Sequence, residues 1–284
     1  MLSRQQKDTY EDKGFLVVED VLSVDEVLAL REVTDYFVEQ SRTVTEHTDV
    51  FDLEPEHTPE EPRLRRLKAP VEQHQVYRDI MNHDGILDIV EELIGPGVRT
   101  NGDKLNMKSP HFGSPIEWHQ DWAFYPHTND DLLAVGVCMD DTLEENGCML
   151  CIPGSHRGPI LDHHQDGYFA GAVTEEVADA DQAELMEVHA GGISLHHVRT
   201  LHASAKNVSA HPRRLLLFQM AAIDAWPLLG VSDWDSFNDN ILRGDPTYEA
   251  RVTDAPVRMP LPPALKGGSI YENQTVLRNK LFAV

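Results

Sequence analysis

The sequence predicts an α+β protein that is mainly β, in which N-terminal helices brace an antiparallel sandwich or barrel. Near the N-terminus, apolar residues recur at helical spacing. After residue 98, short apolar or alternating runs are separated by Gly, Pro, Asn and Asp, as in antiparallel sheets. Helices first and strands later favour helices packed on one sheet. We expect a single domain over 1–284, because sandwiches and barrels of about 200–250 residues are common.

The first part of the chain, 1–97, is expected to be rich in helices. Ser23 and Glu26 have the spacing of a capping box, in which two side chains satisfy the free amides at a helix start. Gly95-Pro96-Gly97 follows the last residues with helical spacing of apolar side chains and predicts the end of a helix there. The expected elements are a leading helix at 3–12, a short strand at 14–18 and helices at about 23–41, 72–81 and 84–94.

Charge changes abruptly after the second of these helices. The segment 43–62 carries seven acids and no Lys or Arg, which predicts a mobile loop. Four basic residues then follow within six positions, and we call Arg63, Arg65, Arg66 and Lys68 the basic run. Such a run could fold over the mouth of a functional site and bind a carboxylate.

A β core is expected over about 98–225, followed by a C-terminal extension at 226–284. The apolar runs that predict its strands lie at 100–108, 133–139, 148–152, 189–198, 200–205 and 213–223. Cys148 and Cys151 fall within one of these runs, and no second pair exists to complete a zinc site. They are therefore interpreted as core cysteines.

Composition limits the possible partners. The chain has 24 Lys and Arg against 48 Asp and Glu, a formal charge of −24, and such a surface repels nucleic acid and anionic membranes. Its three cysteines are an odd number, its start MLSRQQKDTYEDKG is charged, and its apolar runs are far shorter than the ~18 residues of a membrane span. We expect a cytoplasmic monomer or homodimer that acts on a small molecule.

A possible metal motif lies at His119-Gln-Asp121. In an extended segment, residues i and i+2 point the same way, so one imidazole and one carboxylate can reach a single ion. A third ligand from a distant strand would complete a 2-His-1-carboxylate triad, which leaves positions open on Fe(II). His202, which lies in a later apolar segment, is a candidate for that third ligand, with His196 and His197 as competitors.

The distal segment carries two more residues of interest. Ser204 follows His202 at +2 and therefore shares its face of a strand, and Arg213 follows at +11. Arg214 is a competitor for Arg213, because a register shift of one residue exchanges the faces of a strand.

Together these motifs resemble the phytanoyl-CoA dioxygenase family of Fe(II)- and 2-oxoglutarate-dependent oxygenases, which includes ectoine hydroxylase. The resemblance spans about 12–223. The family pattern is H-x-D, then E-N-G-C-x-x-x-x-P-G-S-H, then H-x-S with an Arg eleven residues after its His. The matching positions are 119–121, 145–156, 202–204 and 213.

The resemblance implies a double-stranded β-helix, or jelly roll, with iron near one mouth and 2-oxoglutarate and O2 as cosubstrates. The implied metal ligands are His119, Asp121 and His202. The implied cosubstrate residues are Arg213 and Ser204, with Asn106 and Lys104 as further candidates. A guanidinium offers a planar fork that matches the C5 carboxylate of 2-oxoglutarate, and a hydroxyl adds a donor.

The substrate is less well defined by the sequence. The residues that flank the metal motif either line a substrate pocket or pack in the core, and the sequence favours neither role over the other. The candidates for such a pocket are Trp118, Gln120, Trp122 and Tyr125. Gly158 to Val198 carry eight acids and no Lys or Arg, so we expect an acidic entrance and a neutral or cationic metabolite rather than a coenzyme A thioester. His156 is expected to order a turn, and His163 and His164 to lie in a solvated loop.

Asp121 bears on the type of reaction. In the related halogenases a small residue replaces this carboxylate, so its presence favours hydroxylation. The expected reaction is hydroxylation of an unactivated C–H bond of a small metabolite, with release of succinate and CO2. Two alternatives remain open: a non-catalytic jelly roll that binds a metal or ligand, and a cupin-type metalloenzyme that does not use 2-oxoglutarate.

Overall fold

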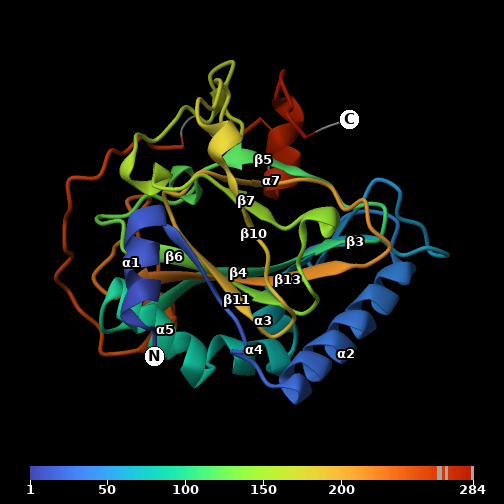
Figure 1. Cartoon of the computed structure of the whole chain (residues 1–284), viewed down its shortest axis with the longest axis horizontal. Coiled ribbons are helices and arrows are strands. Elements are labelled where there is room, and N and C mark those ends of the chain that lie inside the picture. The colour runs from blue at the N-terminus through green and yellow to red at the C-terminus, as the bar shows by residue number, and fades with distance from the viewer. Residues whose placement is uncertain (261–263, 266–267, 283–284) are drawn as a thin grey trace.

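The computed structural model describes residues 1–260, 264–265 and 268–282 and contains two antiparallel sheets that face each other. The larger sheet has the order β1-β11-β6-β13-β4-β3-β2, with β14 added to β4, and the smaller has the order β10-β7-β12-β5. In Figure 1 the helices α2, α4 and α5 lie below the larger sheet. The structure is therefore mainly antiparallel β with helices on one side, as the sequence predicts.

The helices predicted at 3–12, 23–41 and 84–94 and the strand predicted at 14–18 form within one residue of the expected bounds, whereas the helix predicted at 72–81 is divided at His74 into two. The helices are α1 (Arg4–Lys13), α2 (Val24–Gln40), α3 (Pro70–Gln73), α4 (Gln75–Met81), α5 (Asp84–Ile94), α6 (Trp234–Asp239) and α7 (Ile270–Asn273). The strands of the larger sheet are β1 (Phe15–Val18), β2 (Phe51–Leu53), β3 (Leu64–Lys68), β4 (Val98–Lys108), β6 (Leu132–Cys138), β11 (Ile193–His197), β13 (Arg213–Ala222) and β14 (Ile241–Arg243). The others are β5 (Ile116–His119), β7 (Met149–Cys151), β10 (Glu184–Met186), β12 (His202–Ser204) and the hairpin β8 (His164–Gln165) and β9 (Tyr168–Phe169).

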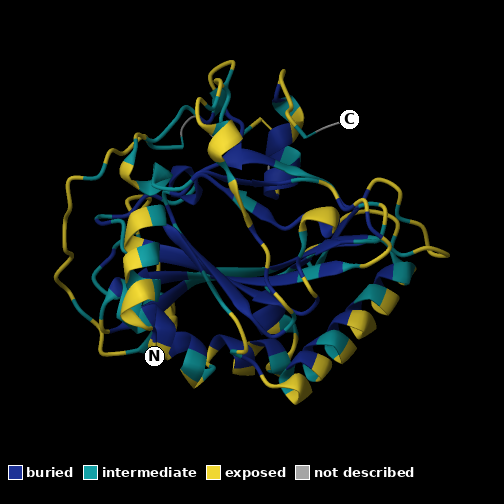
Figure 2. Ribbon diagram, viewed as in Figure 1, coloured by how far each residue is buried: buried dark blue, intermediate teal, exposed yellow. Residues whose placement is uncertain are grey.

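Helix α2 begins where the capping box predicts. The Ser23 hydroxyl accepts the Glu26 backbone N–H, and the Glu26 carboxylate accepts the Ser23 N–H. Its buried side, which includes Leu30 and Phe37, joins a core with residues of α4, α5 and the larger sheet. Figure 2 shows this arrangement as a band of buried residues between the helices and the sheet.

Strand β13 separates this core from the space between the two sheets. Leu216 and Phe218 point toward the helices and belong to the main core, whereas Arg213, Leu217 and Gln219 line a cavity on the opposite face. Side chains alternate between faces along a strand, so the sequence of β13 presents an apolar face to the helices and a partly polar face to the cavity.

The prediction of a mobile loop over 43–62 is wrong for its middle part. Strand β2 pairs with β3, and β3 pairs with β4, so Arg65, Arg66 and Lys68 of the basic run lie on the strand next to the β2 edge of the larger sheet. The acids mislead here because Asp52 is a buried partner of Arg65, at 2.7 Å, rather than a solvated charge.

The C-terminal part returns to the β core. Glu117 on β5 is buried, and its carboxylate oxygens accept the backbone N–H groups of Leu281 and Phe282 at 2.9 and 3.0 Å. Its own N–H donates to Gln274 Oε1 at 3.1 Å. Helix α7 is thereby held beside the cavity, which Ile270 lines. None of the helices in the described part of the chain is long and apolar enough to cross a bilayer.

Candidate metal centre

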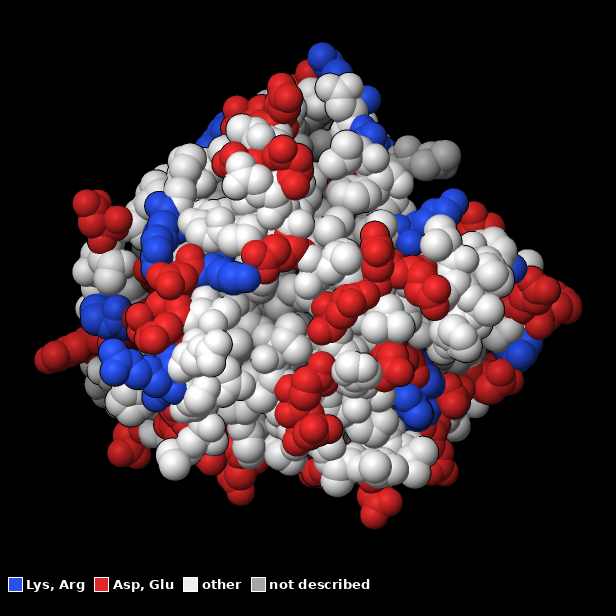
Figure 3. All heavy atoms as spheres, in the orientation of Figure 1, with Lys and Arg blue, Asp and Glu red and all other residues white. Residues whose placement is uncertain are grey.

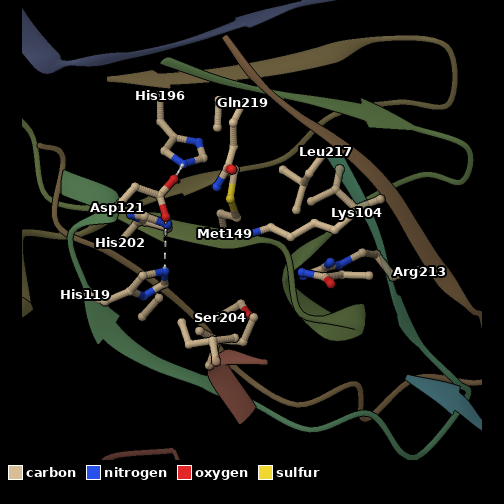
Figure 4. Close-up of a pocket in the computed structure, with 16 residues that line it drawn as sticks. Lys104, His119, Asp121, Met149, His196, His202, Ser204, Arg213, Leu217 and Gln219 are labelled. Carbon is tan, nitrogen blue, oxygen red and sulfur yellow. Dashed lines mark ion pairs between the residues drawn. The ribbon is translucent and has the colours of Figure 1, made fainter. Parts of the chain in front are cut away.

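His119, Asp121 and His202 come together between the two sheets. His119 ends β5, Asp121 follows in a tight turn, and His202 begins β12, where it lies directly opposite His119. One ligand atom from each lies within 4.8 Å of the other two, and all three residues are buried (Figure 4). This spacing allows the three side chains to hold one metal ion.

Backbone carbonyls orient both imidazoles. His119 Nδ1 donates to the Glu117 carbonyl and His202 Nδ1 donates to the Thr200 carbonyl, each at 2.9 Å. With the proton fixed on Nδ1, the lone pair of Nε2 is directed to the shared space, as in most histidine metal sites. Burial lowers the pKa of His119 to about 4 and the pKa of His202 well below its usual value. Both rings are therefore neutral near pH 7 and able to ligate.

Asp121 is the ionised member of the group. Burial alone would raise its pKa, but His196, Lys104 and His202 outweigh burial and hold the pKa well below its usual range. Two neutral imidazoles and one carboxylate suit Fe(II) and leave a net positive charge at the centre. This donor set fits iron and an anionic chelating cosubstrate.

The structure separates His202 from its two competitors. His196 Nε2 lies 3.5 Å from Asp121 Oδ2, and its ring lies 4.3 Å from that of His202, but it is not one of the three residues whose ligand atoms meet. His197 is directed away, with its ring 5.3 Å from that of His156. His196 is thus a neighbour of the candidate ligands.

Arg213 and Arg214 lie on opposite faces of β13. Arg213 is buried, lines the cavity and donates only to the Gly147 carbonyl among the described residues, through Nη2 at 2.7 Å and Nε at 3.2 Å. Arg214 forms ion pairs with Asp140 and Asp35, each at 2.7 Å, outside the cavity. Because burying an unpaired charge is costly, the position of Arg213 indicates an anion site at this end of the cavity.

Ser204 lies at the same end and is held by a lysine that the sequence did not single out. Lys108 Nζ donates to Ser204 Oγ at 2.9 Å and to the Ala205 carbonyl. Lys108 is buried, and burial and the nearby Arg213 lower its pKa well below the usual value. As Ser204 Oγ accepts from Lys108, its own proton is available to a ligand in the cavity.

The remaining cosubstrate candidates, Lys104 and Asn106, also line the cavity. Their side chains come from β4, which pairs with β13. Asn106 Oδ1 is buried without a hydrogen-bond partner, and Lys104 forms no ion pair among the described residues. Figure 4 shows Lys104 directed between the His–Asp group and Arg213.

Only Tyr125 of the four aromatic-pocket candidates lies beside the metal group. Its hydroxyl accepts from Gln219 Nε2 at 2.9 Å, and it lines a second cavity next to Asp121. Trp118 packs against Ile152, Leu201 and Phe282, and Trp122 packs against Leu132 and Ala221. Gln120 is buried and donates to the carbonyls of Pro159 and Arg199. These three side chains therefore support the walls and do not line either cavity.

His163 corrects another expectation. It is buried, donates from Nδ1 to the Leu161 carbonyl and accepts the Gln120 N–H at Nε2, 2.9 Å away, so it braces the metal motif from behind. The prediction of a solvated loop is wrong at this residue. His156 fits its predicted role in a turn, with Nε2 bonded to the Glu11 carbonyl.

Comparison with known proteins gives a consistent family. The sequence model of the phytanoyl-CoA dioxygenase (PhyH) family matches residues 10–215. A protein of Stutzerimonas stutzeri named "Probable alpha-ketoglutarate-dependent hypophosphite dioxygenase" is 35% identical over 288 residues, covering 99% of this chain and 100% of the relative. The ectoine dioxygenase of Halomonas elongata is 27% identical over 236 residues, covering 76% of this chain and 69% of the relative.

Solved structures agree on the fold. The iron-bound crystal structure of EctD from S. alaskensis has a TM-score of 0.66 at 22% identity, covering 78% of this chain and 77% of that chain. EvdO2 of Micromonospora carbonacea var. aurantiaca, solved with 2-oxoglutarate, has a TM-score of 0.61 at 23% identity, covering 82% and 94%. With the family match over most of the chain, the donor set and the unpaired Arg213, these findings lead to one conclusion: the chain belongs to the phytanoyl-CoA dioxygenase family and is an Fe(II)- and 2-oxoglutarate-dependent dioxygenase.

Proposed function

We propose that His119, Asp121 and His202 hold Fe(II), and that Arg213 with Ser204 binds the C5 carboxylate of 2-oxoglutarate. The observation that carries this assignment is the buried pair of imidazoles whose Nε2 atoms meet one carboxylate. The buried guanidinium of Arg213, which has no acidic partner among the described residues, supports the cosubstrate assignment. Asn106 and Lys104 complete the cosubstrate pocket.

The chain's own residues bind and orient the reactants. Iron, when bound, supplies the activation of O2, with one oxygen atom going to succinate and the other to the substrate. Arg213, Ser204 and Lys108 keep 2-oxoglutarate at one end of the cavity, and the apolar Met149, Leu217 and Ile270 limit the space around it.

We also propose that the facing sheets form a double-stranded β-helix and that 1–284 acts as one oxygenase domain. The two antiparallel sheets with the cavity between them support the first proposal. The second is supported by the C-terminal part, since Ile270 lines the same cavity as the residues of β4 and β13.

For the substrate we propose a small phosphorus oxyanion, and specifically hypophosphite. The relative that covers the whole chain carries that substrate in its name. Although acidic side chains are spread over the face seen in Figure 3, the side chains that reach the cavities include the cations Lys104 and Arg66. An anionic substrate fits them better than the neutral or cationic metabolite expected from the net charge. Insertion of one oxygen atom into a P–H bond converts H2PO2⁻ to HPO2(OH)⁻, while 2-oxoglutarate and the second oxygen atom give succinate and CO2.

The cofactor assignment is tested without a substrate. Anaerobic addition of Fe(II) and 2-oxoglutarate should produce a weak visible charge-transfer band that requires both. The band should be lost in His119→Ala, Asp121→Ala and His202→Ala. A band that persists in any of these three variants would refute the ligand set.

The substrate assignment is tested by product formation. Under O2, hypophosphite should give phosphite and succinate in equal amounts, measured by ³¹P NMR and by succinate release. A panel of carbon substrates, including a coenzyme A thioester, is the comparison. Faster coupled succinate release with any of these compounds than with hypophosphite would overturn the substrate proposal.

A further inference from the structure

We propose that Arg66 forms, with Gln219, a second anion subsite next to the metal group, and that this subsite binds the oxyanion of the substrate, while Lys104 lies between it and the cosubstrate. The inference rests on the proposed function, because it assigns a substrate role within the same site. It goes further in naming which cation recognises the substrate and in separating it from the cations that bind the cosubstrate.

Arg66 differs from the other members of the basic run in having no hydrogen-bond or ion-pair partner within the part of the chain that the structure describes. Arg63 pairs with Glu61 at 2.8 Å, Arg65 pairs with Asp52 at 2.7 Å, and Lys68 donates to the Thr48 carbonyl at 2.7 Å. Arg66, although its side chain is partly buried, makes no hydrogen bond or ion pair with any described residue, and its Nε is buried without a partner. An unpartnered buried Nε on a side chain that lines a cavity points to an anion that comes from outside the chain.

The location of Arg66 is set by strand pairing. Arg66 on β3 lies directly opposite Asn106 on β4, and residues that face each other across a strand pair point to the same side. That side is the one on which Asn106 and Leu215 line the cavity of the metal group. The basic run therefore sends one side chain toward the site while its neighbour Arg65 is used in an ion pair with Asp52.

Arg66 lines a second cavity that is adjacent to the first. Lys104, Asp121, Gln219 and Ile270 belong to the walls of both. Arg66 and Tyr125 line only the second, and Arg213 and Ser204 line only the first. The two cavities thus share the wall that carries Asp121 but have separate arginines.

This separation assigns the two anions to different places. A dianionic chelator that reaches Arg213 from the metal group occupies the first cavity, so the second is left for the substrate. There a guanidinium offers paired N–H donors that match two oxygens of a tetrahedral oxyanion. Gln219 Nε2 donates to the Tyr125 hydroxyl at 2.9 Å, which fixes the amide at the wall of this cavity.

Two carboxylates also line the second cavity, and neither pairs with Arg66. Asp103 Oδ1 accepts the Val71 N–H at 2.9 Å, and Asp121 belongs to the metal group. Gly102 lies opposite Gln219 in the strand pair and has φ of +125°, and a Cβ there would lie 3.4 Å from Gln219 Oε1. The side chains of Arg66 and Lys104 on this lining suit an oxyanion better than an apolar acyl chain.

The test compares Arg66→Gln with Arg63→Gln, which removes the same charge from the same run without reaching either cavity. Binding of hypophosphite to the anaerobic protein loaded with Fe(II) and 2-oxoglutarate is measured by calorimetry, and KM for hypophosphite is measured by phosphite formation. Arg66→Gln should weaken both by roughly 10- to 100-fold, as for a lost charged hydrogen-bond donor. Arg63→Gln should change neither, and the 2-oxoglutarate titration of the visible band should be the same in all three proteins.

The possible results separate the subsite from the function. If the wild type gives no band and no succinate, the proposed function fails, and equal phosphite affinity of wild type and Arg66→Gln in calorimetry would then refute the subsite as well. If wild type is active and Arg66→Gln binds hypophosphite normally, only the subsite is refuted. A lower affinity of Arg66→Gln for 2-oxoglutarate, with unchanged hypophosphite binding, would assign Arg66 to the cosubstrate and overturn the proposal.

Arg66→Lys covers the case in which the Gln variant does not fold. This variant keeps the positive charge but loses the paired N–H donors, so its affinity for hypophosphite should be lower than that of the wild type without being abolished. In the wild type, sulfate should compete with hypophosphite but not with 2-oxoglutarate. Failure of sulfate to compete with hypophosphite would count against the subsite without any substitution.

Discussion

Replacement of Arg213 by Gln tests the electrostatic reasoning most directly. The wild-type side chain is buried and donates only to the Gly147 carbonyl among the described residues. With 2-oxoglutarate bound, two charged hydrogen bonds of about 1.5–3 kcal/mol each would be lost. A total of about 3–6 kcal/mol corresponds to a loss of affinity of about two to four orders of magnitude, at about 1.4 kcal/mol per factor of ten. Titration of the anaerobic Fe(II) protein with 2-oxoglutarate, followed by the visible band, measures this loss.

The same substitution should not destabilise the ligand-free protein. Burial of an unpaired cation opposes folding, and Gln can still donate to the Gly147 carbonyl. Arg213→Gln should therefore have a Tm equal to or higher than that of the wild type in the absence of 2-oxoglutarate.

Arg214→Gln is the control for both measurements, because it breaks ion pairs with Asp140 and Asp35 on the opposite face. It should lower Tm and leave the 2-oxoglutarate titration unchanged. If Arg213→Gln loses Tm like Arg214→Gln and keeps its affinity for 2-oxoglutarate, the assignment of an anion site to Arg213 is wrong.

Three further predictions follow from the site. His202→Ala should abolish Fe(II) binding, measured by anaerobic calorimetry, while His196→Ala should change the Fe(II) affinity by less than roughly tenfold. The reason is that His202, and not His196, contributes a ligand atom to the three-residue group. Loss of Fe(II) binding in His196→Ala but not in His202→Ala would exchange their roles. Lys108→Met should raise the half-saturating concentration of 2-oxoglutarate by roughly tenfold through loss of the bond that orients Ser204, without changing Fe(II) affinity, and an unchanged half-saturation would make Lys108 purely structural. Burial lowers the pKa of His163 to about 4, so as the pH falls the His163 imidazole is protonated in the unfolded chain before it is protonated in the folded protein. The free energy of unfolding should therefore decrease as the pH falls from about 6.5 to 4. In urea unfolding of the metal-free protein, His163→Gln should lose less stability over this pH range than the wild type, and an equal loss would contradict the buried, neutral state of His163.

The sequence predicts the metal group well because its spacing is short and its geometry is local. His119 and Asp121 lie two residues apart, at the end of β5 and in the tight turn that follows it, so the two side chains start close together. Ser204 lies two residues after His202 on β12, where strand alternation places the pair on one side. The choice of Arg213 over Arg214 required the register of β13, which the sequence leaves open.

Other residues could not be predicted because partners, rather than residue types, decide their role. The four cations of the basic run look alike in the sequence, and only the tertiary structure shows that Arg66 pairs with none of the residues at 1–260, 264–265 and 268–282. Alternation also fails after Asp121, because residues 121–123 form a 3-10 turn and Trp122 is directed into the core. A signal for Arg66 did exist, as a basic residue one strand away from Asn106, but reading it required knowledge that β3 pairs with β4.

Glu117 connects two parts of the protein that are far apart in sequence. Its carbonyl fixes the proton of His119, and its carboxylate receives the chain at Leu281 and Phe282. Cutting the chain before Leu281 would leave this buried carboxylate without those two donors. Glu117 would then be held less firmly, and its carbonyl orients the candidate iron ligand His119. Removal of Leu281 and Phe282 is therefore expected to weaken Fe(II) binding from outside the coordination sphere. An affinity tag intended for metal-binding studies therefore belongs at the N-terminus.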